Sequence, residues 1–301
     1  MTHIALVLGN GFDLDLGLLT KYSDFADPKN KEWNDFLNMT GTNLKGFLPI
    51  EFVDHMHNAR LYENWFDIEA EILKFANGHT NLREGQIGLI RRQYETLVNC
   101  LRIYIYRQVI STAINEVSLA KNLLYKLNET IHPVGIYSFN YTDCIKLCKC
   151  KKRDCFNLHS IHGTLFYEMT LGCRANDGNK ENHQLDFMYK PKVDLQKNIL
   201  RQNLTLATEV IVFGHSLNDM DYCYFKDFFD AVESGHHICK HLTIICKDAK
   251  SEKQIMDNLT KNVCVEKIKN HIDINFIYTD LWYNKDATTI KRYEDLCNRI
   301  Y

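Results

Sequence analysis

The sequence predicts an α/β protein built on a doubly wound, mostly parallel β-sheet. Six short runs rich in β-branched, leucine and aromatic residues are each of strand length. Helical or irregular polar segments separate most of them, and strands that alternate with helices form parallel, Rossmann-like sheets. The runs are residues 4–8, 134–139, 156–161, 209–213, 242–246 and 274–278.

The first run, residues 4–8, is uninterrupted in its apolar character, which predicts a strand buried on both faces. Gly9 and Gly11 flank Asn10 in the turn that follows, so this turn tolerates positive φ and leaves no Cβ in the way of a ligand. A helix-compatible segment with Asp13 in its opening turn comes next, and a helix N-terminus favours an anion. An isolated G-x-G is more often a plain strand-to-helix turn, and the full G-x-G-x-x-G pattern is absent.

A large helical block separates the first run from the second. The apolar periodicity of helices recurs in four stretches, at the start of 21–42 and over 52–76, 86–117 and 120–128. We therefore predict a helical insertion over residues 28–130, placed after the first strand-helix unit. The Rossmann-like nucleotide-binding core would consist of residues 1–27 and 131–301.

Small and polar residues follow four consecutive runs, and ligands of doubly wound sheets bind beyond the strand ends. Each segment has a plainer explanation when taken alone. Asn140 could cap a helix, His162 could be a buried histidine bonded to a carbonyl, and Asp219 and Asp221 could be first-turn acids. Their coincidence favours a nucleotide site. The segments are G-N-G-F-D at 9–13, N-Y-T-D at 140–143, H-G-T at 162–164 and G-H-S-L-N-D-M-D at 214–221.

The composition is that of an ordinary globular protein, with 301 residues of which 45% are apolar and 25% charged. A net charge of -2 argues against a protein that coats nucleic acid or an anionic membrane. The N-terminal apolar run is too short for a signal peptide or a membrane span, and Asp13 and Asp15 follow it. A cytoplasmic location is therefore the default expectation.

The chain has 11 cysteines, an odd number, scattered and without any C-x-x-C pair. This pattern indicates reduced thiols, and neither a disulfide framework nor a zinc ribbon. Metal binding by the cluster Cys144, Cys148, Cys150 and Cys155 is a minority alternative, and we predict no metal site there.

Several motifs stand in a fixed order along the chain. They are L-V-L-G-N-G-F-D at 6–13, Thr20 with Y-S-D-F at 22–25, N-W-F-D-I-E at 64–69, Y-S-F-N-Y-T at 137–142, I-H-G-T-L at 161–165, L-G-C-R-A-N-D at 171–177 and V-F-G-H-S-L-N-D-M-D at 212–221. In these motifs the sequence resembles, over nearly its whole length, the AbiH-type abortive-infection proteins of bacteria, which defend the cell against phage.

The same order of motifs is similar to that of the sirtuin-like NAD-binding fold. This resemblance implies that NAD or a related nucleotide is the substrate or ligand, that its N-glycosidic bond is hydrolysed, and that no cofactor is required. Asn140 would position the nicotinamide ribose or a water, His162 would be the general base, and Asp13 would orient a ribose or the water. The residues implied to contact the nucleotide are Gly9, Asn10, Gly11, Phe12, Thr142, Gly163, Gly214, His215, Ser216, Asp219 and Asp221.

The sequence departs from the sirtuin pattern in two respects. Thr142 stands where sirtuins carry an acid, and Asp143 comes one position later. The zinc ribbon of deacylating sirtuins has no counterpart, which argues against protein deacylation.

Two other functions stay open. One is a metal-dependent phosphoesterase or nuclease, and the other is a non-catalytic nucleotide sensor. The donors to a divalent ion would be Asp13, Asp219 and Asp221 with His162 or His215. The resemblance also implies a phage-derived trigger, and a homo-oligomer is a further open alternative.

Overall fold

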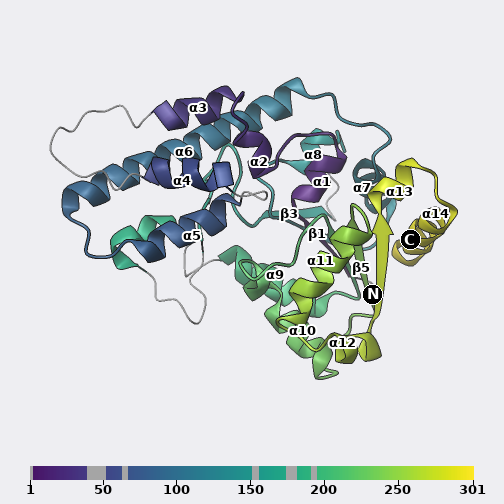
Figure 1. The fold of residues 1–301 in the computed structure, drawn as a ribbon. Coiled ribbons are helices and arrows are strands. Elements are labelled where there is room, and N and C mark those ends of the chain that lie inside the picture. Colours follow the sequence, from purple (N-terminus) through teal and green to yellow (C-terminus); the bar gives the residue numbers. More distant parts are fainter. Residues whose placement is uncertain (1–2, 39–51, 63–66, 151–155, 174–181, 191–194) are drawn as a thin grey trace. The chain divides into compact units, whose positions relative to one another are not determined.

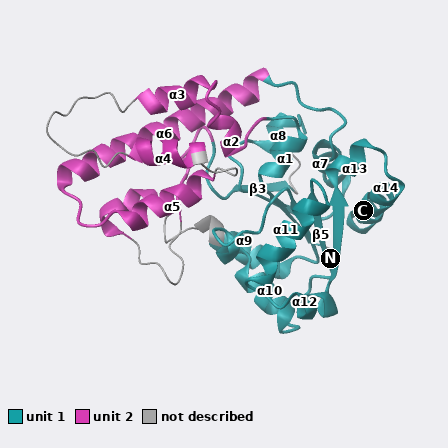
Figure 2. Cartoon of the chain, viewed as in Figure 1, with its two compact units in different colours: residues 1–18, 112–164, 193–301 teal, residues 19–111, 165–192 magenta. Residues whose placement is uncertain are grey.

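The computed structural model of this chain describes residues 3–38, 52–62, 67–150, 156–173, 182–190 and 195–301. The chain divides into two compact units (Figure 2). Unit 1 spans residues 1–18, 112–164 and 193–301, and unit 2 spans residues 19–111 and 165–192.

Unit 1 is built on a single six-stranded sheet (Figure 1). Its strands are β1 (Ile4–Leu8), β2 (Val134–Ser138), β3 (Phe156–Ser160), β4 (Glu209–Phe213), β5 (His241–Cys246) and β6 (Asp273–Tyr278). The strand order is β3-β2-β1-β4-β5-β6 and every pairing is parallel, which is the order of a Rossmann-like sheet. Each predicted run is a strand to within one residue at either end. The predicted doubly wound α/β class is confirmed.

Helices pack against both faces of this sheet. One face is covered by α9 (Leu195–Leu206), α10 (Lys226–Glu233), α11 (Ala249–Thr260) and α12 (Val265–His271). The other is covered by α1 (Asn10–Asp15), α7 (Leu119–Glu129), α8 (Cys144–Leu147) and α14 (Ala287–Ile300). The short helices η3 (Tyr222–Tyr224) and α13 (Thr279–Tyr283) complete the unit.

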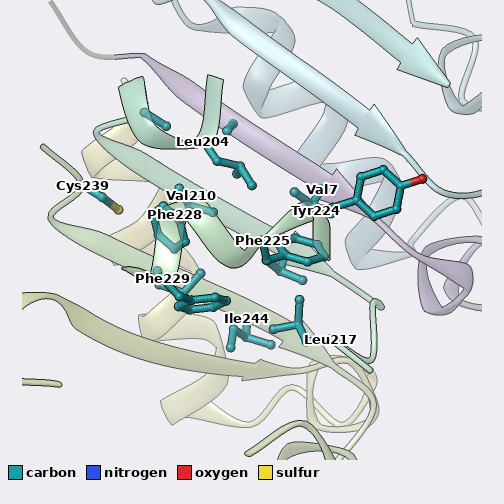
Figure 3. Close-up of a cluster of buried hydrophobic side chains, with 14 of the residues drawn as sticks. Val7, Leu204, Val210, Leu217, Tyr224, Phe225, Phe228, Phe229, Cys239 and Ile244 are labelled. Atoms are coloured by element: carbon teal, nitrogen blue, oxygen red, sulfur yellow. The ribbon is translucent and has the colours of Figure 1, made fainter. Parts of the chain in front are cut away.

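The central strand β1 contributes side chains to two separate cores. Ala5 and Val7 belong to the core under α9–α12, whereas Ile4, Leu6 and Leu8 belong to the other. Successive side chains of a strand point to opposite faces, so a strand covered on both sides must be apolar throughout. Figure 3 shows the first core, in which aromatic side chains that follow β4 pack against the sheet: Tyr224, Phe225, Phe228 and Phe229.

Unit 2 is helical. It contains α2 (Tyr22–Phe25), α3 (Lys31–Leu37), α4 (Phe52–Tyr62), α5 (Ile68–Gly78), α6 (Glu84–Ser111) and the 3-10 helix η2 (His183–Met188). Ile90, Tyr94, Leu97, Leu101 and Ile105 of α6 are buried, which matches the predicted apolar stripe. The predicted helix over 52–76 corresponds to α4 and α5. Within the described part of the chain, no helix combines the length and apolarity that a membrane span requires.

The two units differ from the predicted division in two places. Helix α7, predicted within the insertion, belongs to unit 1, because Leu123 and Leu127 pack in the same core as Ile4. Residues 165–192, predicted within the core, belong to unit 2. There the Tyr94 hydroxyl donates to the carbonyl of Leu171. Helical periodicity identifies an apolar face but not the surface that it packs against, so the sequence pattern did not reveal either assignment.

A buried ion pair fastens α14 to the sheet. Glu209 of β4 is 2% exposed. The guanidinium of Arg299 donates to its two oxygens, with Nε–Oε2 at 3.0 Å and Nη2–Oε1 at 3.1 Å. Thr243 of β5 completes the group, since its hydroxyl donates to Glu209 at 3.2 Å and accepts from Arg299 at 3.0 Å. Two-pronged contacts of this kind are the strongest form of charge-assisted hydrogen bond.

Arg299→Ala should therefore lower the free energy of unfolding by about 3 kcal/mol, because it leaves the Glu209 carboxylate buried without its cation. Urea unfolding measures this loss. The matched control Lys291→Ala removes an exposed cation from the same helix and should stay within about 0.5 kcal/mol of wild type. Equal losses in the two variants would contradict the role of the ion pair.

Candidate functional site

The carboxyl ends of four neighbouring strands form the candidate site. β3, β2, β1 and β4 lie side by side and run in one direction. The predicted segments 9–13, 140–143, 162–164 and 214–221 therefore all leave the sheet at the same edge. The strand order reverses between β1 and β4, and ligands of doubly wound sheets bind at such a switch point.

Three glycines allow the segments after β1 and β4 to pack backbone against backbone. A Cβ on Gly9 would lie 2.5 Å from Cα of His215, and one on Gly11 would lie 2.6 Å from Cα of Gly214. Gly214 has a φ of +65°, a conformation that favours glycine. The N–H groups of Gly9 and Gly11 donate to the carbonyls of Phe213 and Gly214, both at 2.9 Å. These two N–H groups thus bond the neighbouring segment, and the close packing of the two backbones requires glycine at both positions.

Asp13, Asn140 and Thr142 form a buried hydrogen-bonded group, the Asp13 cluster. Asn140 Nδ2 donates to Asp13 Oδ1 at 3.0 Å. The Thr142 hydroxyl lies 2.9 Å from Asp13 Oδ1 and 2.8 Å from Oδ2. All three residues are at most 8% exposed. The cluster joins the segment after β1 to the segment after β2.

The environment of Asp13 favours the protonated, uncharged form of its carboxyl group. Burial raises the pKa of Asp13 from 3.8 to about 7, although the hydrogen bonds from Thr142 and Asn140 act in the opposite direction. Both donors are uncharged, so they do not offset the loss of water around the carboxylate. Asp13 therefore gains and loses its proton in the pH range where most enzymes work.

The side chain of Asn140 is held in one orientation. Its Nδ2 donates to the carbonyl of Gly9 at 3.0 Å as well as to Asp13. A backbone carbonyl can only accept, so the NH₂ group must face Gly9 and the amide oxygen must face away from it. Within the described residues, Oδ1 of Asn140 accepts no hydrogen bond, which makes it an oriented acceptor for a ligand.

A second buried group, the Asp221 cluster, brings together His162, His215 and Asp221. Nε2 of His162 lies 3.6 Å from Asp221 Oδ1, and Nε2 of His215 lies 3.5 Å from Asp221 Oδ2. The three residues are 5%, 5% and 7% exposed. Two strands separate β3 from β4, roughly 14 Å at about 4.8 Å per strand. The segments after β3 and β4 must therefore converge over the ends of β1 and β2.

Sequence reasoning missed two residues that shape this cluster. The Phe139 ring contacts both imidazoles, with centroids 5.2 Å from His162 and 4.4 Å from His215. Leu217 has a φ of +48°, and its N–H donates to Nδ1 of His215 at 3.0 Å. Phe139 ends an apolar run and belongs to the motif at 137–142, but neither pattern indicates a contact with the histidines. Leu217 belonged to a quoted motif but carries no signal for a left-handed conformation.

Two predicted contact residues lie apart from both clusters. Phe12 is fully buried in the hydrophobic core against Phe213, with ring centroids 5.2 Å apart. Its side chain is a core residue, because the first turn of α1 directs it towards the sheet. Asp219 is exposed, accepts from Asn262 Nδ2 at 2.9 Å and lies 3.9 Å from Nζ of Lys261. The carboxylate of Asp219 therefore faces the end of α11, whereas Asp221 faces the histidines.

The other predicted contact residues lie on the segments that lead to these clusters. Asn10 is exposed at the start of α1. Gly163 follows His162 with a φ of +78°, which lets the chain turn sharply after β3. Ser216 is partly buried next to His215, and its carbonyl accepts from Asn258 Nδ2 at 2.9 Å.

The donor groups named for the metal alternatives can be compared with the described residues. Among the described residues, no group of three or more His, Cys, Asp or Glu side chains is arranged to hold a metal ion. Cys144, Cys148 and Cys150 are buried free thiols, and Cys155 lies outside the described residues. Burial raises the pKa of Cys148 to about 12, so its thiol is protonated at neutral pH.

Two quoted motifs lie partly outside the described residues. Of N-W-F-D-I-E, residues 64–66 are not described, and of L-G-C-R-A-N-D, residues 174–177 are not. In unit 2, Asp67 caps α5 by accepting from the N–H of Glu69 at 2.9 Å. Glu69 forms a buried ion pair with Lys190, with Nζ–Oε2 at 3.0 Å. Both described acids of the first motif therefore have structural partners.

Gly214→Ala should lower the free energy of unfolding by about 2–4 kcal/mol, because alanine disfavours positive φ and its Cβ would lie 2.4 Å from Cα of Gly11. Urea unfolding measures the change. The control Gly88→Ala lies within α6, where an added Cβ meets nothing within 4 Å, and should leave stability unchanged or raise it by about 0.5–1 kcal/mol. An unchanged free energy of unfolding in Gly214→Ala would contradict the close backbone contact between Gly214 and Gly11.

Because the pKa of Asp13 is raised in the folded state, the free energy of unfolding should fall as pH rises. Below pH 3.8 the Asp13 carboxyl group is protonated in both the folded and the unfolded state. Between pH 3.8 and about 7 only the folded state keeps the proton, and this stabilises the folded state. Above about pH 7 both states have lost the proton, and the stabilisation is gone. Asp13→Asn is neutral throughout, so wild type should lose about 2.5 kcal/mol relative to the variant between about pH 5 and pH 8. Urea unfolding across this range tests the difference. The exposed control Asp257→Asn should follow wild type at every pH, and a constant gap between Asp13→Asn and wild type would exclude the raised pKa.

Comparison with known proteins assigns the chain to a family. It matches the family described as bacteriophage abortive infection AbiH over residues 5–240. No curated protein matches the sequence. The matched region includes every residue of the Asp13 and Asp221 clusters and ends just before β5. Since the match spans well over half of the chain, this protein belongs to the AbiH family of bacteriophage abortive infection proteins.

Proposed function

We propose that this AbiH protein acts in phage defence by hydrolysing the N-glycosidic bond of NAD or a related nucleotide. The reaction would take place at the carboxyl edge of the sheet, where the Asp13 and Asp221 clusters lie. Water would add to C1′ of the nicotinamide ribose, and the bonding electrons would leave with nicotinamide. Phage infection would supply the trigger.

The orientation of Asn140 carries this proposal. Cleavage of the bond between nicotinamide and ribose passes through a cation-like state at the ribose, which an oriented oxygen acceptor can stabilise or supply with water. Oδ1 of Asn140 is such an acceptor, because Gly9 and Asp13 engage its NH₂ group. An acceptor held before the substrate arrives does not have to reorganise during the reaction.

His162 is the candidate general base for the attacking water. Histidine is the side chain whose ordinary titration lies between pH 5 and pH 8, so it can accept a proton at neutral pH. His162 is buried beside Asp221, and a carboxylate in this place stabilises the imidazolium that forms after proton transfer. The base and the oriented amide come from neighbouring strands, β3 and β2.

Asp13 acts as a positioning residue in this proposal. Both of its oxygens face side chains of the protein, with Asn140 and Thr142 as donors. In this proposal it holds the Asn140 amide, and through that amide it orients the ribose or the water.

Asn140→Ala should lower the rate of nicotinamide release from NAD by about 10²-fold or more, which is the typical cost of removing a preorganised group of this kind. Release is measured on purified protein and on protein from infected cells, since activity can require a trigger. The control Asn270→Ala removes an exposed amide from α12 and should leave the rate unchanged.

Other results of these measurements would favour one of the alternative functions. Equal turnover by wild type and Asn140→Ala would show that the reaction does not take place at the proposed site. Intact NAD together with EDTA-sensitive cleavage of a phosphodiester would favour the phosphoesterase, and tight NAD binding without turnover under any condition would favour the sensor.

A further inference from the structure

We propose that unit 1 carries a second ligand site, which binds a nucleoside monophosphate at the free edge of β6. The site is a pocket lined by residues of α11, α12, β6 and α14, which we call the β6 pocket. β5 lies between β6 and β4, and every residue that lines the pocket follows residue 240, where the family match ends. The β6 pocket is therefore separate from the Asp13 and Asp221 clusters, and this inference does not depend on NAD hydrolysis.

The β6 pocket has the size and lining of a small-molecule site. Its volume is about 310 Å³. Pockets for small molecules range from about 300 to 1,000 Å³ and combine apolar side chains with a few polar groups. A pocket at the low end of this range has room for a mononucleotide but not for a whole dinucleotide such as NAD. The lining includes Glu252, Met256, Lys269, Phe276, Tyr278 and Arg292.

The pocket extends along the outer edge of the sheet. β6 is an edge strand, seen in Figure 1 as the yellow arrow that runs from α12 to α13. Asn275 and Phe276 both line the pocket, although the side chains of successive strand residues point to opposite faces of a sheet. A ligand in the pocket would therefore lie against the edge backbone of β6.

This edge presents backbone donors. The N–H of Asp273 donates to the carbonyl of Lys240, at the start of β5, at 3.0 Å. Successive residues of a parallel strand direct their backbone groups to alternate sides, so those of Ile274 and Phe276 face away from β5. Nη1 of Arg292 donates to the carbonyl of Phe276 at 2.9 Å, as this direction requires. The outward N–H groups of an edge strand are available to a ligand.

Two cations line the amino-terminal and central parts of the pocket. Lys269 lies in the last turn of α12, the helix that leads into the amino end of β6. It forms no ion pair with any residue that the structure describes. Arg292 bonds the middle of β6 through Nη1, and within the described chain no acceptor engages its Nε or Nη2. An ammonium and a guanidinium group are the side-chain donors that best bind a phosphate.

The opposite end of the pocket carries an acceptor. Glu252 lies in the first turn of α11, which begins shortly after the carboxyl end of β5. The hydroxyl of Tyr278, the last residue of β6, donates to Oε2 of Glu252 and holds the carboxylate at this end. A ligand that spans the pocket should thus carry an anion at one end and N–H donors at the other. From Ile274 to Tyr278 the strand covers roughly 13 Å at about 3.3 Å per residue, which is close to the length of an extended mononucleotide.

Apolar side chains lie between the two ends. Met256, Ile274 and Phe276 pack against the core but are only partly buried by it. Nucleobases stack on aromatic side chains, and a thioether makes favourable contacts with aromatic rings. A nucleoside monophosphate therefore matches the pocket in order, with its phosphate at the cations, its base on the apolar surface and an amino group of the base at Glu252. AMP has all three features.

AMP should bind the full-length protein with a Kd below about 1 mM, measured by isothermal titration calorimetry. Adenosine lacks the phosphate and inorganic phosphate lacks the base, so each should bind about tenfold or more weakly than AMP. The methyl resonance of Met256 in the NMR spectrum should shift when AMP is added, because this side chain lines the β6 pocket.

Lys269→Gln should weaken AMP binding about tenfold or more, because a hydrogen bond to a charged partner is lost. The control Lys267→Gln makes the same charge change on a different side of α12 and should keep the Kd within about twofold of wild type. Both lysines are exposed, so both variants should fold. Glu252→Ala should weaken AMP binding about tenfold but should not weaken the binding of ribose 5-phosphate, which has no base.

Other results would overturn the assignment. If AMP does not bind at millimolar concentration, Lys269 and Arg292 only prevent the edge of β6 from pairing with other strands. AMP binding that Lys269→Gln leaves unchanged, or that shifts no Met256 resonance, would place the ligand elsewhere. AMP binding that Asn140→Ala abolishes and Lys269→Gln does not would assign the nucleotide to the site at the Asp13 cluster.

Discussion

The close backbone contact between the segments after β1 and β4 is the constraint on which the site depends. Gly11 and Gly214 approach so closely that neither can carry a Cβ without displacing the other. This contact brings the carbonyl of Gly9 to Asn140 and the backbone of His215 beside Gly9. The two clusters are therefore placed by one feature, and a rigid scaffold of this kind can hold side chains within the tolerance that the proposed catalysis requires.

The two buried carboxyl groups at this edge have different surroundings. Asp13 accepts hydrogen bonds from uncharged donors, and burial raises its pKa to about 7. Asp221 lies between two imidazoles, with its oxygens 3.6 Å from Nε2 of His162 and 3.5 Å from Nε2 of His215. Paired acids in different environments commonly divide the work of acid-base catalysis. Here one accepts from a neutral amide, and the other lies beside two histidines.

Family membership and chemistry are supported by different observations. The match over residues 5–240 connects the chain to phage abortive infection. It does not identify a substrate, and neither does the Rossmann-like sheet, because one fold carries many activities. The substrate proposal depends on the oriented amide of Asn140 and the neighbouring histidine. These are local features, and they are what a biochemical experiment can test.

Much of the fold was accessible from the sequence because it depends on local pattern. A strand covered on both faces is apolar throughout, as β1 is, and short runs rich in β-branched, leucine and aromatic residues located all six strands. The division into two units differs from the predicted one where the packing partner of a segment matters. The periodicity of α7 showed a helix but not that Leu123 packs beside β1, and nothing in residues 165–192 indicated that they join the helical unit.

The sequence by itself determined that polar segments follow β1, β2, β3 and β4, because each lies directly after an apolar run. Only the tertiary structure decided which of their side chains meet. Asp219 and Asp221 are two positions apart, yet one faces Asn262 and the other faces two histidines. The direction of a side chain in an irregular segment depends on backbone dihedrals such as that of Leu217, which long-range contacts impose and no short pattern encodes.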